Sequence, residues 1–92
     1  MKLIAPAITG GRPRVASFLE QSAVRDTESV AFILDGRLVE SAAASFLDEL
    51  VKRLLELGDA ASLTLVGFRE EHVAHFRAAA ERRSVLNRLV IA

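Results

Sequence analysis

The sequence contains no cysteine, no tryptophan and no tyrosine. Without cysteine, disulfides and thiol chemistry are excluded, and a reducing compartment such as the cytoplasm is favoured. No charge predominates either, because 12 Lys and Arg residues balance 12 Asp and Glu residues, which leaves no net field to attract a nucleic acid or an anionic membrane. No secretory leader is recognisable, and no apolar run nears the roughly 20 residues of a membrane span. We expect a soluble cytoplasmic protein that binds neither nucleic acid nor membranes.

The length of the chain, 92 residues, predicts one domain over residues 1–92 with one hydrophobic core. Hydrophobic residues make up 51% of the sequence, but only five of them are aromatic, and all five are phenylalanine. We therefore expect a core of mostly small aliphatic side chains, with some apolar surface left over. Such a surface is typical of a protein that binds a partner, although small domains expose apolar atoms in any case.

The clearest pattern is a strand followed by a long amphipathic helix, between residues 29 and 58. Residues 30–34 are consecutive apolar residues rich in β-branched and aromatic side chains, which predicts a strand covered on both faces. Asp35 and Gly36 end this strand. From residue 46 to residue 55 the apolar positions recur at helical spacing, with charged residues between them, which predicts a helix with a charged outer face.

The rest of the chain continues this alternation of strands and helices. The other predicted elements are strands at residues 2–5, 62–68 and 86–92 and helices at residues 13–24 and 70–84. Strands that alternate with helices usually form a largely parallel sheet with right-handed crossovers. The sequence therefore predicts an α/β fold with a single sheet of about four strands.

The reactive side chains do not fall into an established catalytic or metal-binding motif. Only two residues separate His72 from His75, so the zinc-protease motif is absent, and a solvated or helix-capping pair is the simpler interpretation. Gly10 and Gly11 precede a helix, where backbone amides can bind an anion, but they lack the lysine and spacing of a P-loop. Asp35 could bind Mg²⁺ or act as a base, yet Asp-Gly is also a common turn.

The arginines late in the chain form a basic cluster that we interpret as a solvated helix end. These are Arg77, Arg82, Arg83 and Arg88. Cations are favourable near the carboxyl ends of helices.

The segment before the long helix is rich in serine. Ser41 or Ser45 can cap the helix, and Ser45 with Asp48 or Glu49 resembles a capping box. A phosphorylated serine at this position would also be stabilised by the helix dipole. Capping is the default interpretation.

At this stretch the sequence resembles STAS and STAS-like domains, the fold of bacterial anti-sigma-factor antagonists. In that family a buried strand ends in Asp or Asn and a serine-rich turn then opens the second helix, as Asp35 and Ser45 do here. The string SFLDEL, residues 45–50, is similar to a Ser-Phe-Leu-acid-Glu motif of a STAS-like subfamily of unknown function. The string GGR, residues 10–12, resembles a motif in the first loop of that subfamily.

The resemblance implies a binding module without catalysis. STAS domains dock an ATPase-type anti-sigma kinase, which phosphorylates a serine at the helix start and thereby breaks the complex. By the spacing from Asp35, the family's acceptor serine falls on Ala44 and the Asp before it falls on Ala43. The resemblance therefore implies that the switch is absent here, unless Ser45 or Ser41 replaces the missing serine.

Our first hypothesis is a small non-catalytic regulatory module that binds a protein partner, such as a kinase-like ATPase. The partner would contact the turn before the second helix and the outer face of that helix, whose charges would set partner choice more than affinity. The candidate contact residues are Glu40, Ser41, Ala44, Ser45, Asp48, Glu49 and Lys52, of which Ser45 and Ser41 are also candidate phosphorylation sites. We assign no catalytic residue, cofactor or metal ligand.

Two other hypotheses stay open. The chain could be an assembly subunit that forms a homodimer through its apolar excess and through edge pairing of its final strand. A small enzyme that uses Asp35, Arg12 and a phosphate at Gly10 and Gly11 is the least favoured. A dimer that forms at every protein concentration would favour the assembly subunit. If nucleotides do not raise the melting temperature of the protein, the small enzyme is excluded.

Overall fold

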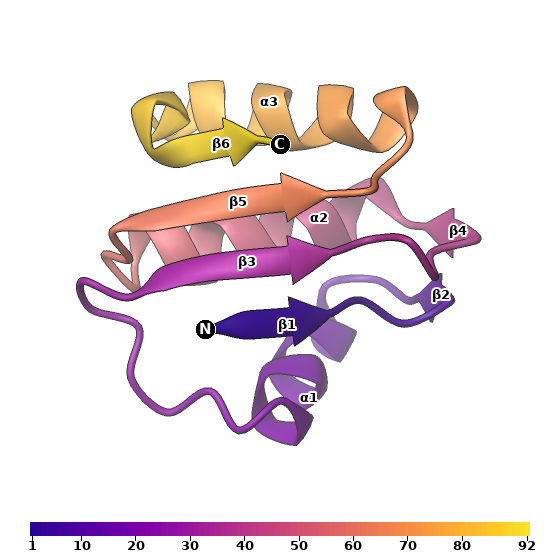
Figure 1. Ribbon diagram of the computed structural model, residues 1–92, viewed down its shortest axis with the longest axis horizontal. Coiled ribbons are helices and arrows are strands. Elements are labelled where there is room, and N and C mark those ends of the chain that lie inside the picture. The colour runs from indigo at the N-terminus through magenta and orange to yellow at the C-terminus, as the bar shows by residue number, and fades with distance from the viewer.

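Four parallel strands form the main sheet of the computed structural model, which describes residues 1–92 (Figure 1). They lie in the order β1 (Lys2–Ile4), β3 (Ala31–Asp35), β5 (Ser62–Val66) and β6 (Leu89–Ile91). The α-helices that connect them are α1 (Pro13–Gln21), α2 (Ala44–Val51) and α3 (Glu70–Arg82). The predicted α/β fold with one four-stranded sheet and alternating helices is confirmed. None of the helices has the length and apolar character needed to cross a membrane.

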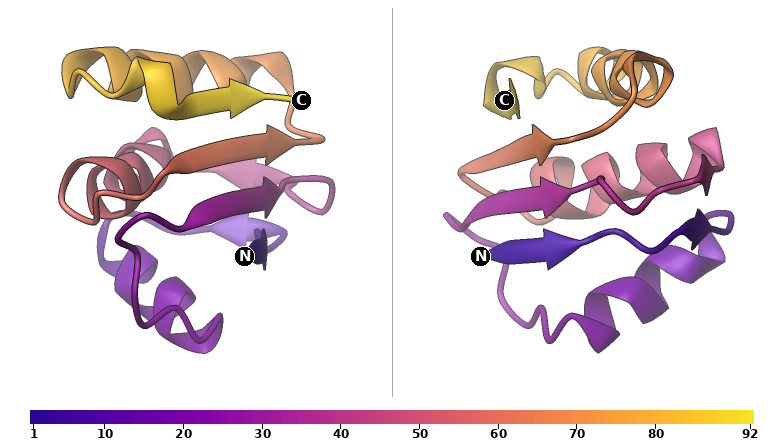
Figure 2. Two further views of the ribbon diagram at one scale, coloured as in Figure 1. Left: turned by 60° about the vertical axis from the view of Figure 1, so that its left-hand side comes forward. Right: turned by 45° about the vertical axis from the view of Figure 1, so that its right-hand side comes forward.

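All three helices lie on the same face of the sheet (Figures 1 and 2). This follows from the strand order, because right-handed crossovers that always step in one direction place every helix on one side. The side chains of β3 alternate accordingly. Phe32 and Leu34 are completely buried beneath the helices, whereas Ile33 between them is 42% exposed. The prediction that this strand is covered on both faces is therefore wrong.

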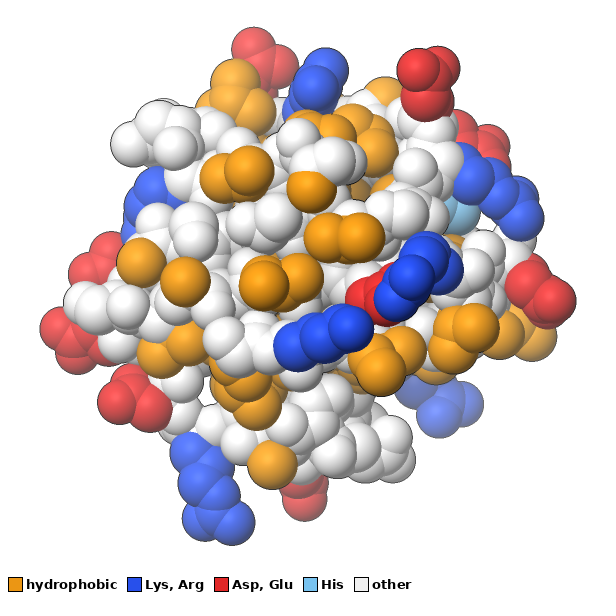
Figure 3. Space-filling model, in the orientation of Figure 1, with side chains coloured by type: hydrophobic (Ala, Val, Ile, Leu, Met, Phe, Trp, Pro, Cys, Tyr) orange, Lys and Arg blue, Asp and Glu red, His pale blue; other side chains and the backbone are white.

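The uncovered face of the sheet mixes apolar and polar side chains (Figure 3). Ile33 lies beside Lys2 on one side and Thr64 on the other, and Thr64 lies beside Val90. Large aliphatic side chains on this face are well exposed, at 56% for Ile4 and 45% for Val90. The expected surplus of apolar surface is thus found on this face.

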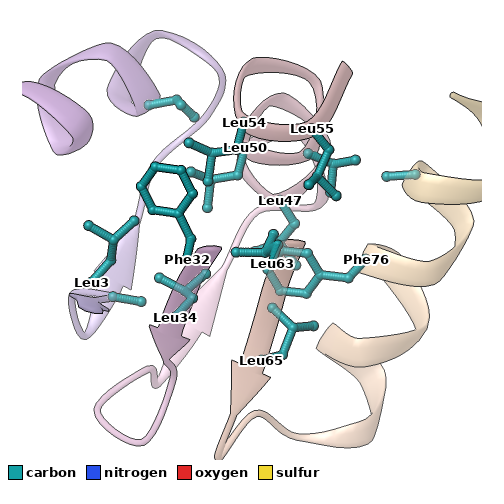
Figure 4. Packing of buried hydrophobic residues seen from close by; sticks show 14 of the residues in the cluster. Leu3, Phe32, Leu34, Leu47, Leu50, Leu54, Leu55, Leu63, Leu65 and Phe76 are labelled. Carbon is teal, nitrogen blue, oxygen red and sulfur yellow. The ribbon is translucent and has the colours of Figure 1, made fainter. Parts of the chain in front are cut away.

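A core of 20 buried hydrophobic residues fills the space between the sheet and the helices (Figure 4). Of these, 16 are Leu, Val or Ala and the other four are Phe, so the expected aliphatic core is confirmed. Burial of each large side chain contributes about 1.5–3 kcal/mol to stability. Phe76 brings α3 onto Leu63 and Leu65 of β5, and Phe32 of β3 lies near Leu50 of α2.

The ends of α2 differ from the prediction. Its N-cap is Ala43, whose side chain cannot accept a hydrogen bond, so Ser45 lies inside the first turn and no capping box forms. At its other end α2 continues as a π-helical turn, η1 (Lys52–Glu56), which buries two consecutive leucines. Gly58 follows after Leu57, and a Cβ at this position would collide with the backbone carbonyl oxygens of Arg53 and Leu54. A glycine is therefore required at this position, just past the end of η1.

Two short features were not predicted. β2 (Ile8–Thr9) pairs in parallel with β4 (Ser41–Ala42) to form a second, very small sheet. A 3₁₀ turn, η2 (Leu86–Arg88), precedes β6, so the last strand is shorter than expected. The small sheet positions the candidate site.

Candidate functional site

The candidate site lies where the loop before α1 meets the start of α2. β2 and β4 hold these segments together, with Ile8 beside Ser41 in the register. The carbonyl oxygen of Ala7 also accepts hydrogen bonds from the backbone N–H groups of Glu40, at 2.8 Å, and Ser41, at 3.1 Å. The GGR and SFLDEL strings, far apart in the sequence, are thereby brought into contact.

The exposed part of this site is formed by a few residues that we call the α2 rim. These are Ile8, Leu38, Glu40, Ser41 and Ala44. Ile8 is 72% exposed and Leu38 is 63% exposed, although both carry large aliphatic side chains. Sequence reasoning selected Glu40, Ser41 and Ala44 but missed the two aliphatic residues, because they lie in a two-residue strand and a turn, where no periodic pattern can mark them.

The two candidate phosphorylation sites differ in accessibility. Ser45 is only partly exposed and lies beside Gly11, where an added Cβ would make an ordinary van der Waals contact with Ser45 Oγ at 3.6 Å. Ser41 is exposed on β4, and Ala44 is exposed at the first position of α2. Of the two serines, Ser41 is the more accessible to a modifying enzyme.

Asp48 and Glu49 of α2 are buried, with only 6% of each residue exposed. Arg12, which ends the GGR string, binds both carboxylates. Its Nη1 donates to Asp48 Oδ2 at 2.8 Å and to Glu49 Oε1 at 3.1 Å. On its own helix, Glu49 also accepts a hydrogen bond from Arg53 Nε at 2.8 Å. The two motifs of the resemblance are therefore joined by ion pairs.

Asp48 is also bound from the other side, by the end of α3. Arg82 Nη2 donates to its Oδ1 at 2.8 Å, and Arg83 Nη2 donates to its Oδ2 at 2.7 Å. Burial by itself would raise the pKa of Asp48, but the hydrogen bonds from Arg83, Arg12 and Arg82 outweigh burial and hold this pKa well below its ordinary value. The carboxylate is thus a charged anchor that links all three helices.

These contacts correct the predicted outer face of the second helix. Asp48 and Glu49 were expected to be exposed, but α2 lies between α1 and α3, so its sides are covered as well as its lower face. Glu49 pairs with Arg53 one turn further along the helix, whereas Asp48 pairs with arginines at the ends of the neighbouring helices. Lys52 itself is only partly exposed, at the far end of α2 from the rim.

The predicted solvated cluster of late arginines is only partly correct, because Arg82 is 62% exposed whereas Arg83 and Arg88 are only 19% and 25% exposed. In addition to the pairs of Arg82 and Arg83, Arg88 donates to the carbonyl oxygens of Ala60 and Leu55, both at 2.8 Å. Arg88 thereby satisfies backbone acceptors after α2, as cations often do near helix ends. Arg77 is exposed, and it is the one arginine of this cluster that forms no ion pair.

Asp35 is used structurally, which agrees with the turn interpretation. Its carboxylate accepts hydrogen bonds from Arg37 Nη2 at 2.6 Å, from Arg37 Nε at 3.0 Å and from the Arg37 backbone N–H at 3.0 Å. These hydrogen bonds lower the pKa of Asp35 to about 2. A carboxylate held charged in this way is a poor general base near neutral pH.

His72 is not solvated as predicted. It is 5% exposed, its ring contacts Phe68 edge-on at a centroid distance of 6.4 Å, and its Nδ1 has no hydrogen-bond partner. His75 on the same helix is exposed. No group of three or more His, Asp or Glu side chains is placed to hold a metal ion.

The glycine loop does not leave Arg12 free for an anion. Gly10 borders a hollow of about 480 Å³ between β1, β2 and α1, in which Arg14 is the one cationic lining residue. Arg12 instead points to the carboxylates of α2. An enzyme that uses Arg12 and Asp35 against a phosphate is not supported by this geometry, because both side chains already have charged partners.

The chain matches no protein-family model, no curated protein and no solved structure. The resemblance to STAS-like domains therefore rests on the motifs of the sequence.

Proposed function

We propose that the chain is a small non-catalytic regulatory module that binds a protein partner through the α2 rim. The observation that carries this proposal is the exposure of Ile8, which pairs with Ser41, and of Leu38, which lies two residues before Glu40. Large side chains that are presented on a rigid support and surrounded by polar groups have the arrangement of interface hot spots. The small sheet and the Arg12 ion pairs supply the rigidity.

The strand order supports a binding role over a catalytic one. Open α/β sheets bind small ligands in the crevice where the strand order reverses. The order β1-β3-β5-β6 never reverses, so the sheet forms no crevice of this kind. Of the reactive side chains singled out in the sequence, Asp35 is paired with Arg37 and His72 is buried.

The partner class that we propose is the one that the resemblance implies, a kinase-like ATPase. Asp48 and Glu49 then stabilise the rim from below rather than contacting the partner, because arginines already bind them. Docking does not depend on a phosphorylated residue at Ala44, which cannot carry phosphate. If a serine regulates the complex, Ser41 is the accessible one.

Two single substitutions and one matched control test this proposal. We expect Ile8→Glu and Leu38→Glu each to weaken binding of the purified partner by about tenfold or more, since a charge would replace an apolar anchor. Leu57→Glu is the control, because Leu57 is 69% exposed but lies beyond the far end of α2. Equal binding by all three variants would contradict the proposal. Incubation with the candidate ATPase and γ-labelled ATP then shows whether Ser41 or Ser45 is modified.

A second candidate function, an assembly subunit, is favoured by the uncovered face of the sheet. Ile4, Ile33 and Val90 are all exposed on this face, which a second copy could cover. Sedimentation at several protein concentrations separates the two functions: a dimer that persists on dilution favours the assembly subunit, and a monomer favours the regulatory module.

A further inference from the structure

The two edges of the main sheet are protected differently. β1 carries Lys2 and is followed by Pro6, two residues that prevent another strand from pairing with an edge. β6, at the opposite edge, contains neither lysine nor proline, and its Val90 and Ile91 are 45% and 37% exposed. The unprotected edge is therefore that of β6.

The backbone of β6 has hydrogen-bonding groups available at this edge. Ala92 N–H donates to the carbonyl oxygen of Leu65 at 3.0 Å. In a parallel ladder alternate residues bond to the neighbouring strand, so Val90 and Ala92 face β5. The N–H and C=O of Ile91 consequently point away from the sheet, where an added strand could bind them.

A groove runs between this edge and α3. Its volume is about 620 Å³, the largest of the three main hollows of the protein. It is lined by Phe68, Glu70, Val73, Ala74, Arg77, Ala78, Glu81 and Ile91, five of which are hydrophobic. In all three views α3 projects slightly beyond β6 (Figures 1 and 2). The helix layer thus extends further than the sheet layer that it covers, as if one more strand were to lie beside β6.

The charge in the groove indicates what such a strand carries. Arg77 has no acidic partner within the chain, unlike Arg82, Arg83 and Arg88, which all form ion pairs. It is flanked in the groove by the small exposed side chains of Ala74 and Ala78. Glu70 and Glu81, which precede and follow Arg77 on α3, also line the groove, so an acidic side chain complements this surface only directly opposite Arg77, with apolar side chains on either side of it.

We propose that the β6 edge and α3 form an acceptor groove for an extended peptide segment of a partner. The segment pairs with the backbone of Ile91 and adds a fifth strand to the sheet. On the side that faces α3, the segment presents alternate apolar residues and one acidic residue opposite Arg77. This is β-strand addition, in which the ladder provides affinity and alternate side chains provide specificity. The groove lies apart from the α2 rim, so this inference stands independently of the function proposed above.

A second copy of the chain fits the groove less well. A two-fold pairing of β6 with β6 places the helices of both copies on the same side of the joined sheet. Because α3 projects beyond the edge, the two α3 helices would then compete for one space. A single extended segment brings no helix of its own and avoids this clash.

Synthetic peptides provide a direct test. The first probe has about eight residues in which Thr alternates with Val, with one inward Val replaced by Asp, and the second probe carries Lys in place of that Asp. Backbone amide spectra of the intact protein are recorded during titration. We expect the Asp probe to shift the amides of β6 and α3 and to protect the amide of Ile91 from hydrogen exchange.

Three variants make the test specific. Arg77→Glu should weaken binding of the Asp probe by about tenfold or more. The same variant should bind the Lys probe instead, because the charges of the pair are then exchanged. Ala78→Arg should block the groove, and it replaces an exposed residue, so the fold is retained. Ser17→Arg is the control, because Ser17 is exposed in the hollow beside β1 and should leave binding unchanged.

Several outcomes would overturn the proposal. One is that the amide shifts map to β1 instead of β6. Another is that the Ala78→Arg variant binds the Asp probe as tightly as the wild type does. A third is that neither probe binds. Broadening of the β6 amides with protein concentration alone would show that a second copy occupies the edge, which also contradicts it.

Discussion

Replacing Asp48 with Asn removes the one negative charge that is shared by arginines at the start of α1 and at the end of α3. The asparagine keeps the shape of the side chain, so the change isolates the ion pairs with Arg12, Arg82 and Arg83. Truncating one partner of a buried ion pair usually costs 3–5 kcal/mol, because the remaining charges are left without compensation. We expect this variant to fold but to be markedly less stable.

The exposure of the arginines decides the magnitude. The side chains of Arg12 and Arg82 are 51% and 62% exposed, so water can solvate them once the carboxylate is gone. The side chain of Arg83 is only 19% exposed and is less easily solvated. We therefore expect a loss of about 2–3 kcal/mol, somewhat below the usual range for fully buried pairs. In a domain of this size that loss corresponds to a melting temperature lower by about 10–20 °C.

The matched control is Asp59→Asn. Asp59 pairs with Arg88 at 3.1 Å, but its side chain is 74% exposed, and exposed pairs contribute about 0–1 kcal/mol. Its φ of 52° is also tolerated by asparagine. Urea unfolding of the wild type and both variants at neutral pH provides the comparison. Equal losses for Asp48→Asn and Asp59→Asn would refute the argument that burial of Asp48 makes its ion pairs important.

The pH dependence of the same variant checks the cause of the loss. The pKa of Asp48 is lower in the folded state than its ordinary value of 3.8. The ion pairs therefore stabilise the fold fully above about pH 4, and this contribution is lost as the pH falls toward the folded-state pKa. The difference in unfolding free energy between wild type and Asp48→Asn should shrink as the pH falls below about 4. A difference that stays constant down to pH 2 would indicate lost packing instead of lost charge.

Two further predictions concern buried positions. Gly36→Ala should lower stability by about 1–3 kcal/mol in urea unfolding, because a Cβ would lie 2.5 Å from the ring of Phe68. Gly10→Ala should cost less, since its Cβ would meet only the flexible side chain of Arg14, and equal costs would contradict this explanation. His72→Phe should leave the melting temperature unchanged or raise it, because it removes a buried nitrogen that has no hydrogen-bond partner. A clear decrease in calorimetry would mean that the imidazole has a role in the fold that these contacts do not explain.

The parts of the fold that were predicted correctly have local causes. The apolar run at residues 30–34 and the helical spacing at residues 46–55 reflect backbone periodicity, which neighbouring residues alone determine. The strand and helix predicted there are confirmed. The exposure of Ile33 was not predicted because it depends on the face of the sheet on which the crossovers place the helices. A short apolar run does not show whether one face or both faces of a strand are covered.

The errors at the candidate site also have non-local causes. Asp48 and Glu49 look like solvent-exposed residues on a helical wheel, and only the positions of α1 and α3 make them buried. The sequence did indicate that the GGR and SFLDEL motifs are important. Their contact through Arg12 and Asp48 could not be deduced from their spacing in the sequence. Glu40 and Ser41 were identified from the serine-rich helix start, whose position depends on local sequence.

The strand order also determines how the chain can fold. Each strand of the main sheet pairs with the strand that precedes it by one helix, so no strand of this sheet has to wait for a partner from a distant part of the sequence. During synthesis each strand can therefore join the sheet as soon as it emerges, and β6 is the last to do so. A nascent chain that stops before β6 would present β5 as its edge, with the free backbone groups of Leu63 and Leu65 in place of those of Ile91.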